Sequence, residues 1–206
     1  VMSCNPAIGG LAKGQIVREV DALGGLMGLA IDAAGIQFRI LNISKGPAVQ
    51  SPRAQADKYK YSVWMREKLE QTENLTIIEA TAADITVEDK KVRAVVCRDG
   101  SSYRTQTVIV TTGTFLRGLM HVGAEQSSGG RFGEPSSEEL SLALERIGLK
   151  LGRLKTGTPP RLDASTVDFD KLEVQYGDKE PVPFSFITDR IDREQIPCWV
   201  TYTNEN

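Results

Sequence analysis

The sequence has few of the residues that build metal sites and disulfide frameworks. Its 206 residues include one histidine, His121, and three cysteines, at positions 4, 97 and 198. The cysteines are odd in number, lie far apart and form no Cys-x-x-Cys pair, so they predict neither a disulfide scaffold nor a zinc site. We therefore expect no metal centre. This cysteine usage is typical of the reducing cytoplasm, which is the location we predict.

Long apolar runs and a surplus of one charge are also missing. The sequence contains no run of about 18 apolar residues, so it predicts no membrane-spanning helix. The N-terminus also lacks the basic and apolar regions of a signal peptide. With 25 Lys and Arg against 27 Asp and Glu, the net charge is −2, so any contact with RNA must be local. The length of 206 residues predicts one domain, or one and a fraction, and a hydrophobic content of 40% excludes a disordered chain.

The most distinctive stretch, Ser-Cys-Asn-Pro-Ala-Ile-Gly-Gly, occupies residues 3–10. Its proline and glycine pair allow a sharp turn with exposed amide N–H groups, ahead of a helical pattern. The positive end of that helix and the nearby Lys13 would favour a thiolate at Cys4 or a bound anion. The alternative is that Cys4 is a small buried hydrophobic residue.

The first quarter of the chain alternates between helical and extended patterns. Apolar residues recur at spacings of three and four from Gln15 to Ala34, which predicts a helix that is broken at Gly24-Gly25. Residues 36–41 alternate as in a strand, and residues 54–71 have the apolar side of a second helix.

Between that strand and the second helix we predict a loop over residues 42–53. It contains two prolines, a glycine and two cations, Lys45 and Arg53. A functional loop and a solvated connection are equally compatible with this composition.

After the second helix the hydrophobic period changes from 3.6 to 2. Short strands are predicted over residues 75–80, 85–87, 92–97, 103–105 and 107–110. Asp89-Lys90-Lys91 and Asp99-Gly100-Ser101 have the composition of hairpin turns, so the middle three strands form an antiparallel meander. We expect Cys97, inside the meander, to be structural.

The last of these strands, residues 107–110, is nearly all apolar, as in a central parallel strand that is covered on both faces. It ends at Thr112-Gly113, where small residues let a ligand approach the backbone. This order of elements predicts an α/β fold of the two-dinucleotide-binding, glutathione-reductase-like type. The chain then holds its FAD domain, with the β-meander but without the first βα unit.

Two later segments carry candidate ligand contacts. Ser136 or Ser137 is a predicted N-cap for a helix over residues 138–147, and the same hydroxyl could contact phosphate or flavin. Residues 150–155 are predicted to form a strand that leads into a Pro-Pro turn. The turn presents three cations that could hold a phosphate of a cofactor or of RNA, or could simply be solvated: Arg153, Lys155 and Arg161.

From these patterns we predict two domains, both incomplete. Residues 1–160 form the FAD-binding domain, and residues 161–206 begin a second, inserted domain with strand-like runs at 183–186 and 198–202; the family resemblance described below implies that this insertion is an α+β domain of NADH-binding type. The chain opens directly into the Cys-Asn-Pro turn and stops at residue 206 without a closing element. We therefore expect it to be a fragment of a longer protein.

Several longer stretches resemble the MnmG (GidA) family, the flavoprotein partner in wobble-uridine modification of tRNA. The resemblance extends along essentially the whole chain, in order. It is carried by residues 3–10, 35–42, 44–49, 53–57, 112–116, 152–161 and 197–204, among them the runs Ser-Cys-Asn-Pro-Ala-Ile-Gly-Gly and Lys-Thr-Gly-Thr-Pro-Pro-Arg.

The resemblance implies an FAD enzyme that installs a carboxymethylaminomethyl or aminomethyl group at C5 of U34. The implied partners are tRNA, the GTPase MnmE and a second copy of the chain, with NADH as flavin reductant and methylene-tetrahydrofolate as one-carbon donor. Cys4 matches one of the family's two functional cysteines, near the flavin. The family's FAD contacts fall on Ala82, which stands where valine is common and acts through its backbone, and on Ser137.

Two family features have no counterpart in the sequence. The Gly-x-Gly-x-x-Gly loop would precede Val1, and the second functional cysteine, in an Arg-Tyr-Cys-Pro-Ser segment, would follow Asn206. Cys198 belongs to a different motif and does not replace it. Two alternatives stay open. One is the related folate- and FAD-dependent tRNA uridine methyltransferase, which shares the fold but has different signature loops. The other, for the fragment alone, is a non-catalytic scaffold, because the phosphate-binding loop is missing.

Overall fold

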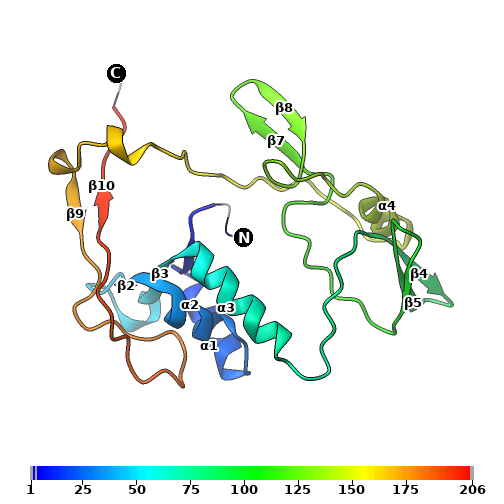
Figure 1. The fold of residues 1–206 in the computed structure, drawn as a ribbon, viewed down its shortest axis with the longest axis horizontal. Helices are drawn as coiled ribbons and strands as arrows, with labels where there is room; N and C mark the ends of the chain where they lie inside the picture. The colour runs from blue at the N-terminus through cyan, green and yellow to red at the C-terminus, as the bar shows by residue number, and fades with distance from the viewer. Residues whose placement is uncertain (1, 3, 205–206) are drawn as a thin grey trace. The chain divides into compact units, whose positions relative to one another are not determined.

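The computed structural model describes residue 2 and residues 4–204, so Ser3, which opens the Ser-Cys-Asn-Pro stretch, lies outside the described residues. The chain divides into two compact units (Figure 1). The first is formed by Val1–Thr76 with Gly157–Asn206, and the second by Ile77–Thr156. Each unit has its own cluster of buried apolar side chains.

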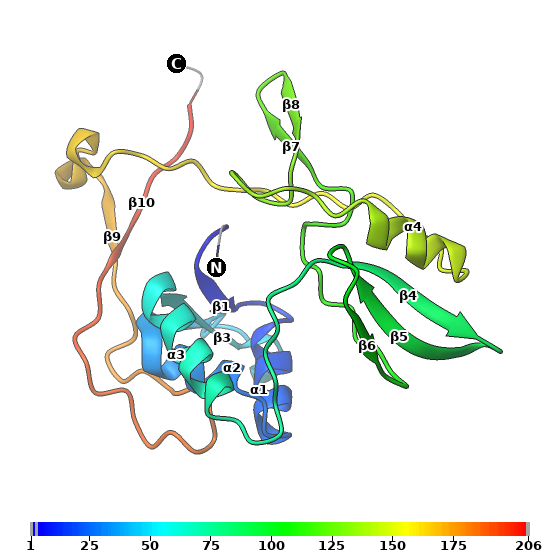
Figure 2. The ribbon, with the colours of Figure 1, turned by 45° about the vertical axis from the view of Figure 1, so that its right-hand side comes forward.

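The first unit is built on a three-stranded antiparallel sheet. Its strands are β1 (Ala7–Gly9), β2 (Gly35–Leu41) and β3 (Ser51–Ala56), in the order β1-β3-β2. One face carries Phe38 and Ala54, which pack with Val17 of α1 (Gly14–Ala22) and Ile31 of α2 (Met27–Ala34). The sheet and its helices lie together in Figure 2. The other face of the sheet therefore points away from this core.

The predicted break at Gly24-Gly25 is confirmed, because α1 and α2 are separate helices on either side of it. The predicted start of the next helix at residue 54 is wrong. Residues 51–56 form β3, and α3 (Lys58–Glu70) begins after Asp57, whose side chain accepts hydrogen bonds from the amides of the first turn. The short segment Pro47–Val49 is a 3₁₀ turn, η1.

The C-terminal segment lies along the free edge of β2. The amide of Phe38 donates to Oε1 of Gln195, and the amide of Ile40 donates to Oδ2 of Asp178, both at 2.7 Å. These side chains take the place of a further strand for the two amides, whose hydrogen bonds are thereby satisfied. Phe184 is fully buried in the core, although residues 183–186 form no strand.

The rest of this segment is irregular apart from four short elements. These are η2 (Ala164–Thr166), η3 (Phe169–Lys171), β9 (Glu173–Gln175) and β10 (Cys198–Val200), of which β9 and β10 pair antiparallel. Residues 157–204 thus add to the core of the first unit. The assignment of 1–160 to FAD binding and 161–206 to NADH binding concerns ligands and stays a prediction.

The predicted meander is confirmed in the second unit. Strands β4 (Ala82–Glu88), β5 (Lys91–Cys97) and β6 (Ser102–Arg104) pair antiparallel in that order. Asp89 and Lys90 have φ values of 50° and 60°, the left-handed conformation of a tight hairpin turn. Leu140 and Leu144 of α4 (Glu139–Arg146) pack on Ile85 of β4.

One hairpin in the second unit was not predicted. Strands β7 (Leu119–Val122) and β8 (Glu125–Ser128) pair antiparallel in a region for which the sequence predicts no strand. None of the helices in the described part of the chain is long and apolar enough to cross a membrane.

Three predicted strands are absent from the described residues. Residues 75–80, 107–110 and 150–155 have no regular structure, and Ile109 is 89% exposed. A strand needs a neighbour for its backbone groups, and no described residue pairs with these segments. The mixed α/β class is confirmed, with antiparallel sheets in place of the parallel strand expected at 107–110.

Candidate functional site

Cys4 lies three residues before β1 and is half-buried. The glycines that follow it make the sharp turn that the sequence predicts, with φ values of 82° at Gly9 and 97° at Gly10. The amide of Gly10 donates to the carbonyl of Pro52 at 2.9 Å, which anchors this turn to β3. The backbone around the thiol is therefore fixed by the first sheet.

The predicted anion-binding helix end is only partly available. The amides of Lys13 and Gly14 both donate to the carbonyl of Gly10, at 3.0 and 2.8 Å, so two donors ahead of α1 are already used. Lys13 is the exposed N-cap of this helix and makes no side-chain cap hydrogen bond. The helix end thus offers little to a thiolate or an anion through these amides.

Arg161 is brought to Cys4 although the two residues are 157 positions apart. Its guanidinium donates to the carbonyl oxygen of Cys4 at 3.0 Å. The structure therefore joins the predicted catalytic cysteine to one of the three cations of the Pro-Pro turn, and it fixes the cysteine backbone without using the thiol.

The other two cations belong to the second unit. Arg153 donates to the carbonyl of Arg117 at 2.7 Å, and Lys155 is exposed. The segment around them is irregular, which corrects the predicted strand at 150–155. The three cations are thus divided between two units.

The remaining cysteines have structural surroundings. Cys97 is 6% exposed within the meander, in agreement with the structural role expected for it. Cys198 lies on β10, and its thiol donates to Oε1 of Gln37 at 3.4 Å. The described residues contain no group of three or more histidine, cysteine or acidic side chains that could hold a metal ion.

All predicted FAD contacts fall in the second unit. The turn at Thr112-Gly113 is closed by a hydrogen bond from the amide of Phe115 to the carbonyl of Thr112, at 3.2 Å. The carbonyl of Phe115 then accepts from the amide of Ser137, at 2.7 Å. The turn and Ser137 are thus held together, whereas Ala82 begins β4 and packs near Leu140 and Leu144.

The predicted N-cap at Ser136 or Ser137 is wrong. Glu138 occupies the N-cap position of α4 without a side-chain cap. Ser137 forms a parallel bridge with Leu116, so both its amide and its carbonyl are used by the segment that follows the Thr112 turn. Its hydroxyl has no hydrogen-bond partner among the described residues, so it could bind a ligand.

Sequence reasoning missed one arrangement of charged side chains. Arg39 and Arg53 lie directly opposite each other on β2 and β3, on the face away from the core. The alternation in residues 36–41 placed Arg39 on a strand, but β3 was not predicted, so the pair could not be found.

Comparison with known proteins decides the family. The model of the family described as glucose inhibited division protein A matches residues 1–206. The chain belongs to the GidA family.

Relatives and a solved structure agree with this assignment. The chain is 56% identical over 204 residues to the tRNA uridine 5-carboxymethylaminomethyl modification enzyme MnmG of Thermodesulfovibrio yellowstonii, covering 99% of this chain and 33% of that protein. The identity to MnmG of Geobacter sulfurreducens is 57% over 205 residues, covering 100% and 33%. The structure of Aquifex aeolicus GidA matches with a TM-score of 0.91 at 52% identity, covering 96% of this chain and 34% of that one. The 206-residue chain thus spans about a third of the length of these relatives.

Proposed function

We propose that this chain is part of an FAD-dependent enzyme that adds a carboxymethylaminomethyl or aminomethyl group at C5 of the wobble uridine of tRNA. The observation that carries the proposal is the match to proteins named for this modification, over nearly the whole chain at 56% and 57% identity. The complete protein, and not this third of it, performs the reaction in the cytoplasm.

Cys4 is the chain's own candidate for the chemistry. A thiolate is a good nucleophile, and the backbone of Cys4 is held by Arg161 while no described residue takes up the thiol. In this proposal the first unit holds the thiol that reacts with the uridine near the flavin. Arg161, which binds the carbonyl of Cys4, acts as a positioning residue.

The second unit supplies groups that suit one side of a flavin dinucleotide. Gly113 has a φ of 58° and no atom within 4 Å of the position a Cβ would take, so a ligand can approach its backbone. The hydroxyls of Thr112 and Ser137 have no described partner and can donate to phosphate or ribityl oxygens. We propose that these residues and the backbone of Ala82 hold FAD, which supplies two-electron redox chemistry when bound.

The remaining parts of the proposal follow from the family. NADH reduces the flavin, methylene-tetrahydrofolate provides the one-carbon unit, and the enzyme works as a homodimer with the GTPase MnmE. Residues 1–160 serve the FAD domain in its two-dinucleotide-binding fold, and residues 161–206 begin the NADH-binding insertion. Lys13, Arg153, Lys155 and Arg161 are the candidate contacts for tRNA phosphates.

The first test is a visible absorbance scan of the purified 206-residue chain after FAD has been added in excess and unbound FAD removed. Retained flavin absorbance, lost on replacing Ser137 by Ala and Gly113 by Val, supports the assignment of the FAD contacts. A colourless chain would mean that the FAD site needs residues outside the chain. If the complete protein also binds no FAD, the proposed function is wrong.

The second test replaces Cys4 by serine in the complete protein. We expect tRNA modification to be lost while FAD stays bound, because the thiol acts chemically and does not pack the core. Cys198→Ser, on β10 of the same unit, is the matched control and keeps activity. Loss of FAD together with activity in Cys4→Ser would instead give the cysteine a structural role.

A further inference from the structure

The outer face of the first sheet carries two arginines in direct register. Arg39 of β2 pairs with Arg53 of β3, and Gln37 pairs with Gln55 next to them. Directly opposed residues of an antiparallel pair have Cβ atoms about 4.5–5.5 Å apart, and like charges in that position repel each other. A sheet gains nothing in stability from such a pair unless something negative lies over it.

No carboxylate of residue 2 or residues 4–204 fills that role. Within the described residues, neither guanidinium has an ion-pair or hydrogen-bond partner, and Nε of Arg39 is buried without one. Other arginines of the chain are paired: Arg98 with Glu139 and Arg117 with Glu145, each at 2.7 Å. Buried donors without an acceptor are rare in folded proteins, because each costs the free energy of its lost hydration.

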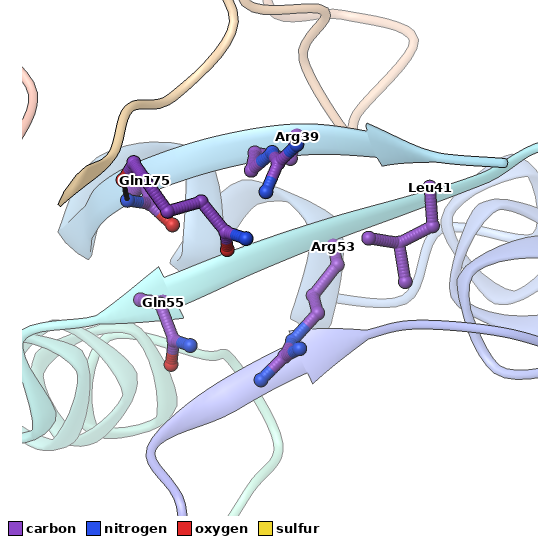
Figure 3. A pocket seen from close by; sticks show the side chains of 6 residues that line it. Arg39, Leu41, Arg53, Gln55 and Gln175 are labelled. Carbon is purple, nitrogen blue, oxygen red and sulfur yellow. Dashed lines mark hydrogen bonds between the residues drawn. The ribbon is translucent and has the colours of Figure 1, made fainter. Parts of the chain in front are cut away.

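The side chains around the arginines complete a cavity that is rich in donors. It is lined by Gln37, Arg39, Leu41, Arg53, Gln55 and Gln175. Figure 3 shows Arg39 on one strand, Arg53 and Gln55 on the next, and Gln175 reaching over the sheet from the C-terminal segment. The lining contains no acidic residue.

The glutamines differ in what they can still bind. The amide of Gln37 is already used, because Nε2 donates to the carbonyls of Gln175 and Ile196 at 2.9 and 3.3 Å. This fixes the segment of Gln175 over the sheet. The side-chain amides of Gln55 and Gln175 have no partner among the described residues and can donate to a ligand.

We propose that Arg39 and Arg53, assisted by Gln55 and Gln175, bind a phosphate group. Two guanidiniums on adjacent strands offer several N–H donors to one tetrahedral anion, and Arg–phosphate contacts are charge-assisted and often bidentate. A phosphate carries one negative charge as an RNA phosphodiester and nearly two as a terminal phosphate, and in either form it would reduce the repulsion between the arginines. The phosphate belongs either to the backbone of an RNA or to a nucleotide. The proposed site recognises the phosphate group, which both of these ligands contain.

Binding of inorganic phosphate to the complete protein, saturated with FAD so that the flavin site is filled, tests this site. We expect Arg39→Gln and Arg53→Gln each to weaken phosphate binding at one site by about 10-fold to 100-fold, because each removes a charged donor. Arg66→Gln is the matched control, since Arg66 lies exposed on α3 and only pairs with Glu70 at 3.8 Å. Equal phosphate binding by the wild type and both variants would overturn the proposal.

The same variants separate the two sources of phosphate. If the phosphate is that of RNA, each variant lowers tRNA affinity and makes the slope of log K against log salt shallower by about one. If it is that of a nucleotide, tRNA affinity is unchanged and ADP displaces inorganic phosphate from the wild type only.

Thermal unfolding distinguishes a binding role from a structural one. Removing one of two opposed like charges is expected to leave the melting temperature of the unliganded protein unchanged or higher. A lower melting temperature with unchanged phosphate binding would show that the arginines are structural. FAD retention needs neither arginine, so failure here is distinguishable from failure of the flavin assignment.

Discussion

At the scale of single residues, Gly9 has two separate reasons to be glycine. Its φ is 82°, and a Cβ would stand 2.2 Å from the carbonyl oxygen of Pro52 and 2.8 Å from the ring of Phe184. Gly10 has a similar φ of 97° but open space at its Cβ position. We expect Gly10→Ala to lose about 1–2 kcal/mol of unfolding free energy from backbone strain, and Gly9→Ala to lose clearly more. Denaturant unfolding measures both, and equal losses would mean that the contact with Pro52 and Phe184 relaxes.

Asp32 is the buried carboxylate that ties the C-terminal segment to α2. It is 3% exposed and accepts from the amides of Phe184 and Ser185, both at 2.8 Å. Burial raises the pKa of Asp32 above its ordinary value of 3.8, and the two amide hydrogen bonds offset part of that effect. Asp32→Asn keeps the shape of the side chain, but its NH₂ group would face one of these two amide N–H donors. We therefore expect the unfolding free energy to fall by about 1–3 kcal/mol at neutral pH.

The raised pKa of Asp32 also predicts a pH dependence. Because the folded chain holds this proton more tightly than the unfolded chain, the contribution of Asp32 to stability is fully present below pH 3.8 and declines as the pH rises through the folded-state pKa. The difference in unfolding free energy between wild type and Asp32→Asn should therefore grow as the pH is lowered through that window. A difference that shrinks on acidification would contradict a raised pKa.

At the scale of elements, α4 is held to the meander by a few side chains. Leu144 is 4% exposed against Ile85, whereas Leu142 on the same helix is 55% exposed. We expect Leu144→Ala to cost about 2–5 kcal/mol, because it leaves a cavity between α4 and β4. Hydrogen exchange of the β4 and β5 amides measures the loss, and Leu142→Ala is the control. Equal protection in the two variants would mean that this contact does not stabilise the meander.

Local chemistry predicted the elements that depend on local interactions. The spacing of apolar residues with Gly24-Gly25 separated α1 from α2, and Asp89-Lys90 identified the turn between β4 and β5. By contrast, β3 contains Pro52 and no β-branched residue, so nothing in its sequence indicates a strand. It is a strand because β1 and β2 pair with it on both sides.

The candidate site shows the same division between local and distant contacts. The glycine turn after Cys4 follows from its residues, and the structure has it. The hydrogen bond from Arg161 to Cys4 and the register of Arg39 with Arg53 join residues far apart in sequence or on an unpredicted strand. Ser137 was misassigned as a cap for a similar reason, since its partner is Leu116. Such pairings are set by the tertiary fold.

At the scale of the whole molecule, the exposed apolar segments predict how the chain sits in a longer protein. Ile109 is 89% exposed in a segment whose composition is that of a covered strand, and the chain spans about a third of its relatives' length. We expect Ile109→Asp to change the unfolding free energy of the 206-residue chain by less than about 0.5 kcal/mol, because the side chain already lies in water.

In the complete protein the same substitution should be far more costly. If residues outside the chain cover residues 107–110, Ile109→Asp buries a carboxylate without a partner and lowers the unfolding free energy by several kcal/mol, or prevents folding. Denaturant unfolding of both lengths, with and without the substitution, gives the comparison. A small effect in both lengths would show that residues 107–110 stay exposed, and the parallel strand expected there would then have to be abandoned for the complete protein as well.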